Sequence, residues 1–105
     1  MRSSVGPNGL TNMQQPIHAK FESGVLVATS QASGVLTSDD VAQALTRHLS
    51  GDWGELSEED RQTNEQALVE EGRLLSAYTG SAGVKFWIIT EWDRSYTTVL
   101  LPEDY

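Results

Sequence analysis

Three strand-like runs follow one another almost without a break near the end of the chain, at residues 73–79, 84–92 and 96–101. The last third of the chain also contains two of the three tryptophans and all three tyrosines. Aromatic and β-branched residues favour strands, and the short connections between these runs have the glycine, serine and aspartate of hairpin turns. The pattern therefore predicts an antiparallel meander of three strands, against which the rest of the chain packs.

The upstream half predicts one further strand and two helices. A strand is expected within residues 20–29, with a bend at Gly24 and a place at the edge of the sheet, and residues 30–36 are predicted to form a loop. Capping residues at Thr37 and at Ser57 then begin two helices, which end near Ser50 and at Gly72. The order β-α-α-β-β-β predicts the α+β class, with an antiparallel sheet and two helices packed on one face.

The chain of 105 residues has the length of one domain. Residues 1–17 are rich in serine, glycine, proline, asparagine and glutamine and are predicted to be a flexible tail, which leaves residues 18–105 as a single α+β domain. Met13 stands just before this domain, so a natural start at Met13 instead of Met1 is an alternative that the sequence leaves open.

Composition excludes several classes of protein. Cysteine is absent, and no apolar run approaches the roughly 18 residues that cross a bilayer, so we expect a cytoplasmic protein without disulfides or membrane contact. No cofactor is expected, because Gly80 and Gly83 suit a turn and form no phosphate-binding fingerprint. Metal binding is not expected either, because His18 and His48 are the only histidines.

The acidic residues are concentrated in one stretch. The chain has 15 acidic and 7 basic side chains and a formal net charge of -8, and residues 52–71 hold eight of the acids against Arg61 alone. Such a surface repels phosphate backbones and attracts basic ones, so we expect a protein partner with a basic surface and no free nucleic acid. The alternative is that these charges only keep a surface helix in solution.

A candidate partner-binding set lies in and just before the second helix. Trp53 stands between two glycines and beside acids, and an exposed tryptophan with an acidic rim is typical of a binding hot spot. Trp53 could equally fold back as a lid over the core, and Trp92 is a second candidate for an exposed aromatic. The candidate partner-binding residues are Asp52, Trp53, Glu55, Glu58, Glu59, Asp60 and Glu65.

An enzymatic alternative uses polar side chains around the last hairpin. No nucleophile with a paired base is visible, which argues against a common type of hydrolase. A cluster of hydroxyl, carboxylate and guanidinium groups could still bind phosphate or cleave RNA. Its candidate catalytic residues are His48, Arg73, Glu91, Arg94 and Thr98. The competing interpretation is a charged hairpin tip, strand-forming threonines and a histidine at a helix end.

Four segments together carry a resemblance to a known family. They are GDWGEL at 51–56, RLLSAY at 73–78, WIITE at 87–91, and DRS followed by TTVLLPEDY between 93 and 105. They resemble a family of small uncharacterised bacterial proteins labelled plasmid-related, some of which carry a restriction-modification subunit label. The resemblance covers residues 20–105, with a departure at Trp92, where the family has a small residue. It implies a setting in plasmids, integrative elements or phages, and it implies no catalytic residue.

Three functions follow as hypotheses. The first is a small acidic interaction protein of mobile genetic elements, which inhibits a host nucleic-acid-targeting defence of the restriction or CRISPR type through its acidic face. The second is a ribonuclease or phosphate-binding enzyme, because the predicted architecture looks like that of RelE and barnase, although fold does not imply function and a basic surface is missing. The third is a regulatory protein-binding module unrelated to defence. An exposed edge strand would also allow a homodimer.

Overall fold

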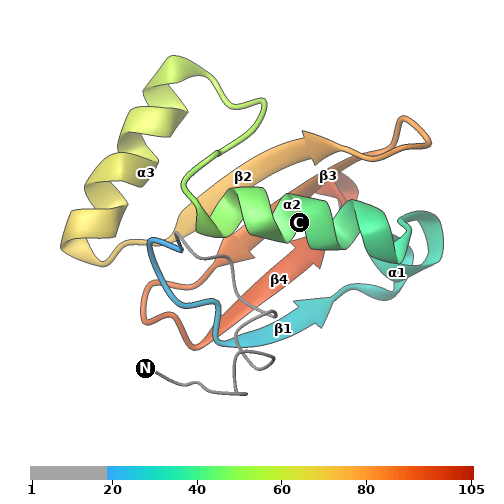
Figure 1. Cartoon of the computed structure of the whole chain (residues 1–105), viewed down its shortest axis with the longest axis horizontal. Helices are drawn as coiled ribbons and strands as arrows, with labels where there is room; N and C mark the ends of the chain where they lie inside the picture. Colours follow the sequence, from blue (N-terminus) through green and yellow to red (C-terminus); the bar gives the residue numbers. More distant parts are fainter. Residues whose placement is uncertain (1–18) are drawn as a thin grey trace, which may run out of the picture.

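The structure is a computed structural model, and it describes residues 19–105. The predicted tail at 1–17, the candidate start at Met13 and His18 lie outside the described residues. The described part contains a four-stranded sheet and three helices, which confirms the α+β class. In chain order the elements are β1 (Val25–Ala28), α1 (Ser30–Val35), α2 (Ser38–Leu49), α3 (Glu58–Glu70), β2 (Leu74–Thr79), β3 (Lys85–Thr90), β4 (Tyr96–Leu100) and the short 3₁₀ turn η2 (Pro102–Asp104) (Figure 1).

The strands lie in the order β1-β4-β3-β2. β2 pairs with β3 and β3 with β4 in antiparallel fashion, which confirms the predicted meander. β1 lies at the edge, as predicted, but it runs parallel to β4, so the prediction of a fully antiparallel sheet is wrong for this pair. The reason is topological, because all three helices and two strands separate β1 from β4 in the chain, and no hairpin turn sets their relative direction.

Gly24 fixes the entry of the chain into β1. Its φ angle is +64°, a conformation that side chains disfavour, which agrees with the predicted bend. A Cβ atom at this position would stand 2.3 Å from the carbonyl oxygen of Ser95. The absence of a side chain therefore lets the chain approach the β3–β4 hairpin closely enough for β1 to pair with β4.

The segment that the sequence predicted as a loop at 30–36 contains helix α1 instead. The hydroxyl of Thr29 caps this helix by accepting a hydrogen bond from the N–H of Ala32 at 3.2 Å, and Ala32 is buried in the core. The helix has only six residues and includes Gly34, so its local propensity is poor. Packing of Ala32 against the sheet decides the conformation here.

The two predicted helices begin where their capping residues place them. The hydroxyl of Thr37 accepts from the N–H of Asp40 at 3.0 Å, and the Asp40 carboxylate accepts from the N–H of Thr37 at 3.2 Å, a reciprocal capping box at the start of α2. Ser57 begins α3 by accepting from the N–H of Asp60 at 3.2 Å. α3 ends with Glu71 in a left-handed conformation, although a glycine follows it directly.

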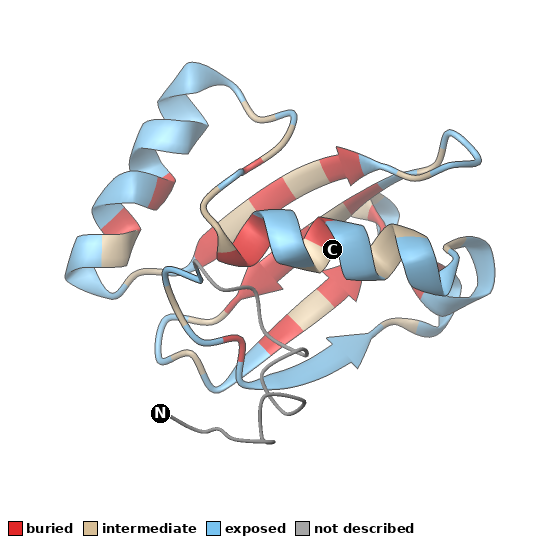
Figure 2. Cartoon of the chain, viewed as in Figure 1, coloured by how far each residue is buried: buried red, intermediate tan, exposed pale blue. Residues whose placement is uncertain are grey.

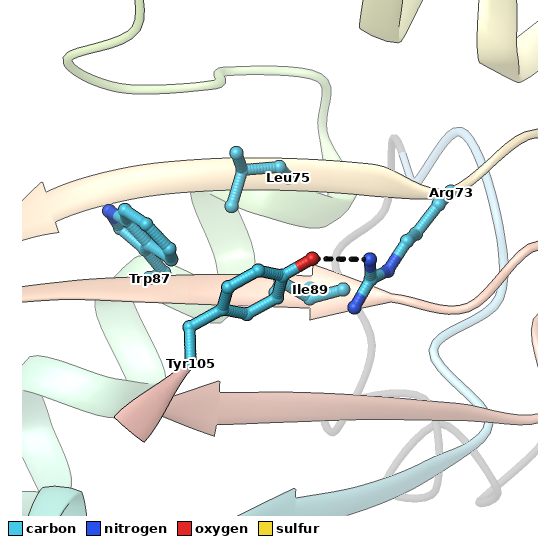
Figure 3. Close-up of a pocket in the computed structure, with 5 residues that line it drawn as sticks. All are labelled: Arg73, Leu75, Trp87, Ile89 and Tyr105. Carbon is cyan, nitrogen blue, oxygen red and sulfur yellow. Dashed lines mark hydrogen bonds between the residues drawn. The ribbon is translucent and has the colours of Figure 1, made fainter. Parts of the chain in front are cut away.

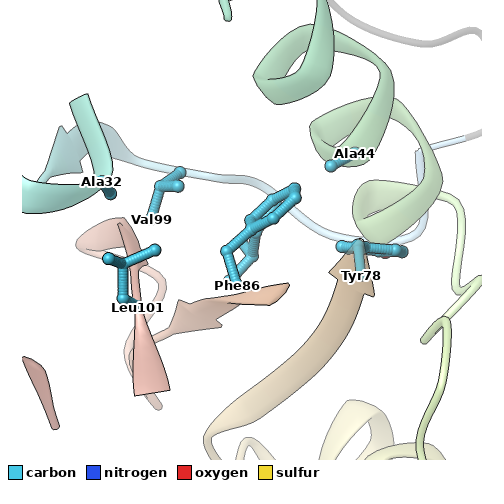
Figure 4. Close-up of a cluster of buried hydrophobic side chains, with 7 residues drawn as sticks. Ala32, Ala44, Tyr78, Phe86, Val99 and Leu101 are labelled. Atoms are coloured by element: carbon cyan, nitrogen blue, oxygen red, sulfur yellow. The ribbon is translucent and has the colours of Figure 1, made fainter. Parts of the chain in front are cut away.

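The main core lies between α2 and one face of the sheet, and Figure 4 shows its side chains. Its buried members are Ala32, Ala44, Tyr78, Phe86, Ile88, Val99 and Leu101. A second cluster of Trp53, Ala67 and Leu74 forms where α3 meets the sheet. α2 packs on the sheet face, whereas α3 stands beyond the edge strand β2 (Figure 1). The predicted packing of two helices on one face, in the order β-α-α-β-β-β, is therefore not confirmed.

The opposite face of the sheet has no helix over it within residues 19–105. Side chains alternate along a strand, so Leu75, Trp87, Ile89 and Thr98 point away from the core of Figure 4. The ring of Tyr105 covers part of this face and meets Trp87 edge-on at 5.7 Å between ring centroids. Both sides of β3 are apolar, with Phe86 and Ile88 on one and Trp87 and Ile89 on the other. Within residues 19–105, large neighbouring side chains cover the second side, and no further layer does.

Candidate functional site

The acidic surface predicted from the sequence lies on α3 and at its end. Glu58, Glu59, Asp60, Glu65, Glu70 and Glu71 are all exposed. Figure 2 shows a helix that is pale blue over most of its surface and red at two positions only. Among the described residues, none of these six carboxylates forms an ion pair with a lysine or arginine. Within residues 19–105, these carboxylates are therefore left without ion-pair partners.

α3 is held to the sheet through a narrow stripe. Asn64 and Ala67 are its buried residues, and Leu68 packs beside Ala67 in the second cluster. Arg94, from the β3–β4 hairpin, donates to the carbonyl oxygens of Ala67 at 3.2 Å and of Gly72 at 2.6 Å. These bonds satisfy carbonyl groups at the end of the helix, and they place a positive charge at the negative end of its dipole. Of the exposed acids only Glu65 helps to hold the helix, by accepting from the indole of Trp53.

Two predicted partner-binding acids lie in the connector between α2 and α3, residues 50–57, and both already bind side chains of this chain. Asp52 pairs with Arg47 at 2.8 Å, and this hydrogen bond lowers the pKa of the Asp52 carboxyl. Glu55 accepts from the hydroxyl of Thr79 at 2.8 Å and pairs with Lys85 at 3.4 Å, and the Thr79 bond is the main cause of its lowered pKa. Both carboxylates thus stabilise the connector against its neighbours, and they contribute less free charge than those of α3.

Trp53 is a core residue. The structure therefore supports the interpretation in which Trp53 folds back over the core, and not the one in which it is exposed. Its side chain is 4% exposed and stacks on Phe21 at 6.1 Å between ring centroids. The indole Nε1–H donates to the Glu65 carboxylate at 2.8 Å, which joins the connector to α3. The proposed role of Trp53 as an exposed hot spot is therefore wrong. Trp92 is the exposed tryptophan, at 61%.

The connector also closes the outer edge of β2. The N–H of Ala77 donates to the carbonyl of Trp53 at 3.2 Å, and the N–H of Glu55 donates to the carbonyl of Ala77 at 2.8 Å. Gly54 makes this approach possible, because its φ is +77° and a Cβ there would lie 2.0 Å from the Ala77 oxygen. Gly54 therefore serves the pairing of the connector with β2.

His48, a candidate catalytic residue, is completely buried inside a chain of hydrogen bonds. Its Nδ1 lies 2.6 Å from the hydroxyl of Ser76, and its Nε2 lies 2.9 Å from the hydroxyl of Thr90. Thr90 in turn lies 2.7 Å from Thr97, whose hydroxyl donates to the carbonyl of Ser23 at 2.7 Å.

The proton positions in this network follow from its last bond. Because Thr97 donates to a carbonyl, its oxygen accepts from Thr90, and Thr90 must then accept from Nε2–H of His48. Nδ1 is left to accept from Ser76. Burial, together with the nearby positive charge of Arg94, lowers the pKa of His48 to about 3. The histidine is thus neutral, satisfied and structural near pH 7.

The other catalytic candidates do not converge on His48. Arg73 and Glu91 lie 3.7 Å apart, between Nε and Oε2, at one end of the sheet. Thr98 points to the face opposite His48, because its neighbour Thr97 points toward it. Arg94 is turned toward the carbonyl groups at the end of α3. The five side chains therefore form no single site.

The open face of the sheet, the one opposite α2, contains a pocket that was not predicted from the sequence. Its volume is about 280 Å³, and it is lined by Arg73, Leu75, Trp87, Ile89 and Tyr105 (Figure 3). The guanidinium of Arg73 donates to the Tyr105 hydroxyl at 2.8 Å and thereby closes one side. The only signal in the sequence was the apolar character of both sides of the strand that contains Trp87 and Ile89. A shallow, mainly apolar hollow of this kind suits an apolar side chain or a small ring.

Residues 19–105 contain no group of three or more side chains suited to holding a metal ion. No helix in this part of the chain has the length and apolar character needed to span a bilayer. The chain matches no protein-family model, no curated protein and no solved structure.

Proposed function

We propose that this chain is a small acidic interaction protein, which binds a protein partner with a basic surface through α3. The observation that carries the proposal is the row of six exposed carboxylates on and next to one helix, none of them paired with a described cation. Charge of one sign on one surface attracts a partner of opposite sign and speeds its approach.

The needs of folding explain only part of this charge. Glu58, Glu59 and Asp60 occupy the first turn of α3, where acids interact favourably with the helix dipole. Glu70 and Glu71 stand at the opposite end, where acids oppose the dipole by roughly 0.3–1 kcal/mol each at exposed positions. A basic partner would offset this unfavourable placement on binding, so acids at both ends of the helix are consistent with a binding surface.

The target that we favour is a nucleic-acid-targeting defence assembly of a bacterial host, of the restriction or CRISPR type. This part of the proposal rests on the resemblance to plasmid-related proteins, and it places the protein in the cytoplasm of a cell that carries a mobile element. Proteins that hold nucleic acid have basic surfaces, and an acidic helix can occupy such a surface in competition with phosphate groups. A regulatory partner unrelated to defence would use the same surface and is the second possibility.

The ribonuclease alternative receives no support from the geometry. Its histidine is buried and neutral, and its arginines bind carbonyl, carboxylate and hydroxyl groups of this chain. A general acid or base must reach the proton that it transfers, and His48 has no exposed atom with which to do so.

Affinity capture from a nuclease-treated bacterial lysate with three tagged baits tests the proposal. The first bait is the wild-type chain. The second carries Glu58→Gln, Glu59→Gln and Glu70→Gln on α3. The third carries Glu22→Gln, Asp39→Asn and Glu103→Gln, exposed acids elsewhere on the protein. Both variants lose three negative charges from the same net charge of -8, and Asp39, like Glu58, lies in the first turn of a helix.

The expected result is one basic nucleic-acid-handling assembly that is retained by the wild type and by the third bait and is lost from the second. Retention should also fall as the salt concentration rises, because salt screens exposed charges. A partner retained equally by all three baits would place the contact elsewhere, and the absence of any specific partner would contradict the proposal.

A further inference from the structure

The outer edge of β1 is uncovered within residues 19–105, and it is apolar. Val25, Leu26 and Val27 are exposed by 68%, 54% and 45%, and Figure 2 shows the whole strand in pale blue. Natural sheet edges are usually protected by a lysine, a proline, a bulge or a covering segment. β2, at the opposite edge, has such a cover in the connector around Gly54. β1 has none among the described residues.

Backbone groups of β1 are available for a further strand. The N–H of Val25 donates to the carbonyl of Ser95, just before β4, and the N–H of Thr29 donates to the carbonyl of Val99 in β4, both at 3.0 Å. Alternate residues of a strand direct their backbone groups to opposite sides. Leu26 and Ala28 therefore direct their N–H and C=O groups away from β4, toward the open edge.

The strand at this edge carries no charge itself, and the Asp104 carboxylate, which accepts from the Thr29 hydroxyl at 2.7 Å, stands at its end. Residues 23–38 include β1 and α1 and contain no aspartate, glutamate, lysine, arginine or histidine. The six unpaired acids of α3 and its end lie beyond β2, which is three strands away from β1. Two copies of a protein with a net charge of -8 repel each other, and an edge strand without charged side chains adds less to this repulsion than the acidic helix would.

We propose that the β1 edge binds the β1 edge of a second copy of this chain, with the strands antiparallel and related by a two-fold axis. The residues whose backbone groups point outward, Leu26 and Ala28, fix the register. Leu26 of each copy pairs with Ala28 of the other, and the two Val27 residues face each other at the two-fold axis. Each of the two Leu26–Ala28 pairs exchanges two hydrogen bonds, which satisfies every outward backbone group of β1.

The side chains of β1 suit this register. Val27 lies on the open face beside Thr98, its neighbour in β4. In the dimer the two Val27 residues would form a non-hydrogen-bonded pair, in which cross-strand side chains are closest. The result is a continuous eight-stranded sheet with an acidic helix beyond each outer end. Pairing through a strand of four residues buries a small area compared with a standard protein–protein interface. The dimer is therefore expected to dissociate on dilution.

Sedimentation of the full chain over about a hundredfold range of concentration measures this association. The wild type is expected to pass from monomer to dimer. Val27→Lys places two like charges opposite each other and removes an apolar contact, and it should raise the dissociation constant of the dimer by about tenfold or more. The control is Val69→Lys, the same change at an exposed valine on α3, which should leave the dimer intact.

Hydrogen exchange of the wild-type chain gives an independent readout that does not depend on the fold of a variant. The amides of Leu26 and Ala28 should exchange slowly at high concentration and become faster on dilution. A monomer at all concentrations overturns the proposal. If these amides are protected in the monomer, residues 1–18 or another segment of the same chain covers the edge, which also overturns it. Either result leaves the proposed role of α3 untouched.

Discussion

Asn64 of α3 binds both backbone groups of Leu75 in β2. Its Nδ2 donates to the Leu75 carbonyl at 2.6 Å, and its Oδ1 accepts from the Leu75 N–H at 3.2 Å. The side-chain amide thus occupies the place of a neighbouring strand at the outer edge of the sheet. It continues the cover that the connector provides at Ala77. One buried polar residue therefore both attaches the acidic helix and protects the edge strand beneath it.

Asn64→Ala is expected to lower the free energy of unfolding by about 1–3 kcal/mol, because it leaves a partly buried N–H and a carbonyl without partners. The matched control is Gln66→Ala, an exposed amide on the same helix, which should change stability by less than about 0.5 kcal/mol. Urea denaturation of the three proteins measures the difference. Equal midpoints for both variants would show that the Asn64 bonds do not hold the helix.

The buried histidine makes stability depend on pH. The pKa of His48 is about 3 in the folded chain and near 6.5 when unfolded, so below pH 6.5 the unfolded state binds a proton that the folded state does not. The free energy of unfolding therefore falls with acidification, by about 2 kcal/mol between about pH 7 and pH 5. The lowered pKa values of Asp40, Asp52 and Glu55 cause losses only below about pH 5, as the pH falls through the pKa values of the unfolded carboxyls.

Denaturation at several pH values, with His48→Gln as the comparison, isolates this contribution. The variant is expected to be less stable at pH 7, because glutamine cannot reproduce both bonds to Ser76 and Thr90. Its stability should nevertheless change little over the same pH interval. His18 is present in both proteins and cancels in the comparison. A wild-type slope that persists in His48→Gln would assign the pH dependence to another group.

Two glycines near the exposed edge should respond in opposite ways to alanine. Gly24→Ala forces a side chain into a positive φ and against the backbone of Ser95, and it should cost at least about 2 kcal/mol. Gly34→Ala lies in α1 with no atom near the new Cβ, and it should be neutral or stabilise by about 0.5–1 kcal/mol. Thermal denaturation distinguishes them, and a tolerated Gly24→Ala would contradict the close approach described for β1.

The elements with strong local signals were predictable from the sequence. The caps at Thr37 and Ser57 gave the starts of two helices, and the alternation of large apolar residues gave the three C-terminal strands. The direction of β1 was not predictable, because it depends on a pairing between residues about 70 positions apart, with no turn to define it. α1 was missed because tertiary packing of Ala32 outweighs a weak local preference.

The candidate site was predictable in part. The concentration of acids and its place on a surface helix follow from composition and helical spacing. The sequence could not show that Asp52 and Glu55 would pair with cations, that Trp53 would turn inward to Glu65, or that His48 would be enclosed. Each of these outcomes depends on which distant side chain completes a contact, and local sequence does not specify that.

The most direct test of the central claim is a titration of the captured partner with the purified chain at low and at high salt. We predict that the α3 variant with Glu58, Glu59 and Glu70 neutralised binds at least about tenfold more weakly than the wild type at low salt, where exposed charges are least screened. The variant with Glu22, Asp39 and Glu103 neutralised should bind like the wild type. Affinities that are equal for all three proteins, and unchanged by salt, would contradict a function through the acidic helix.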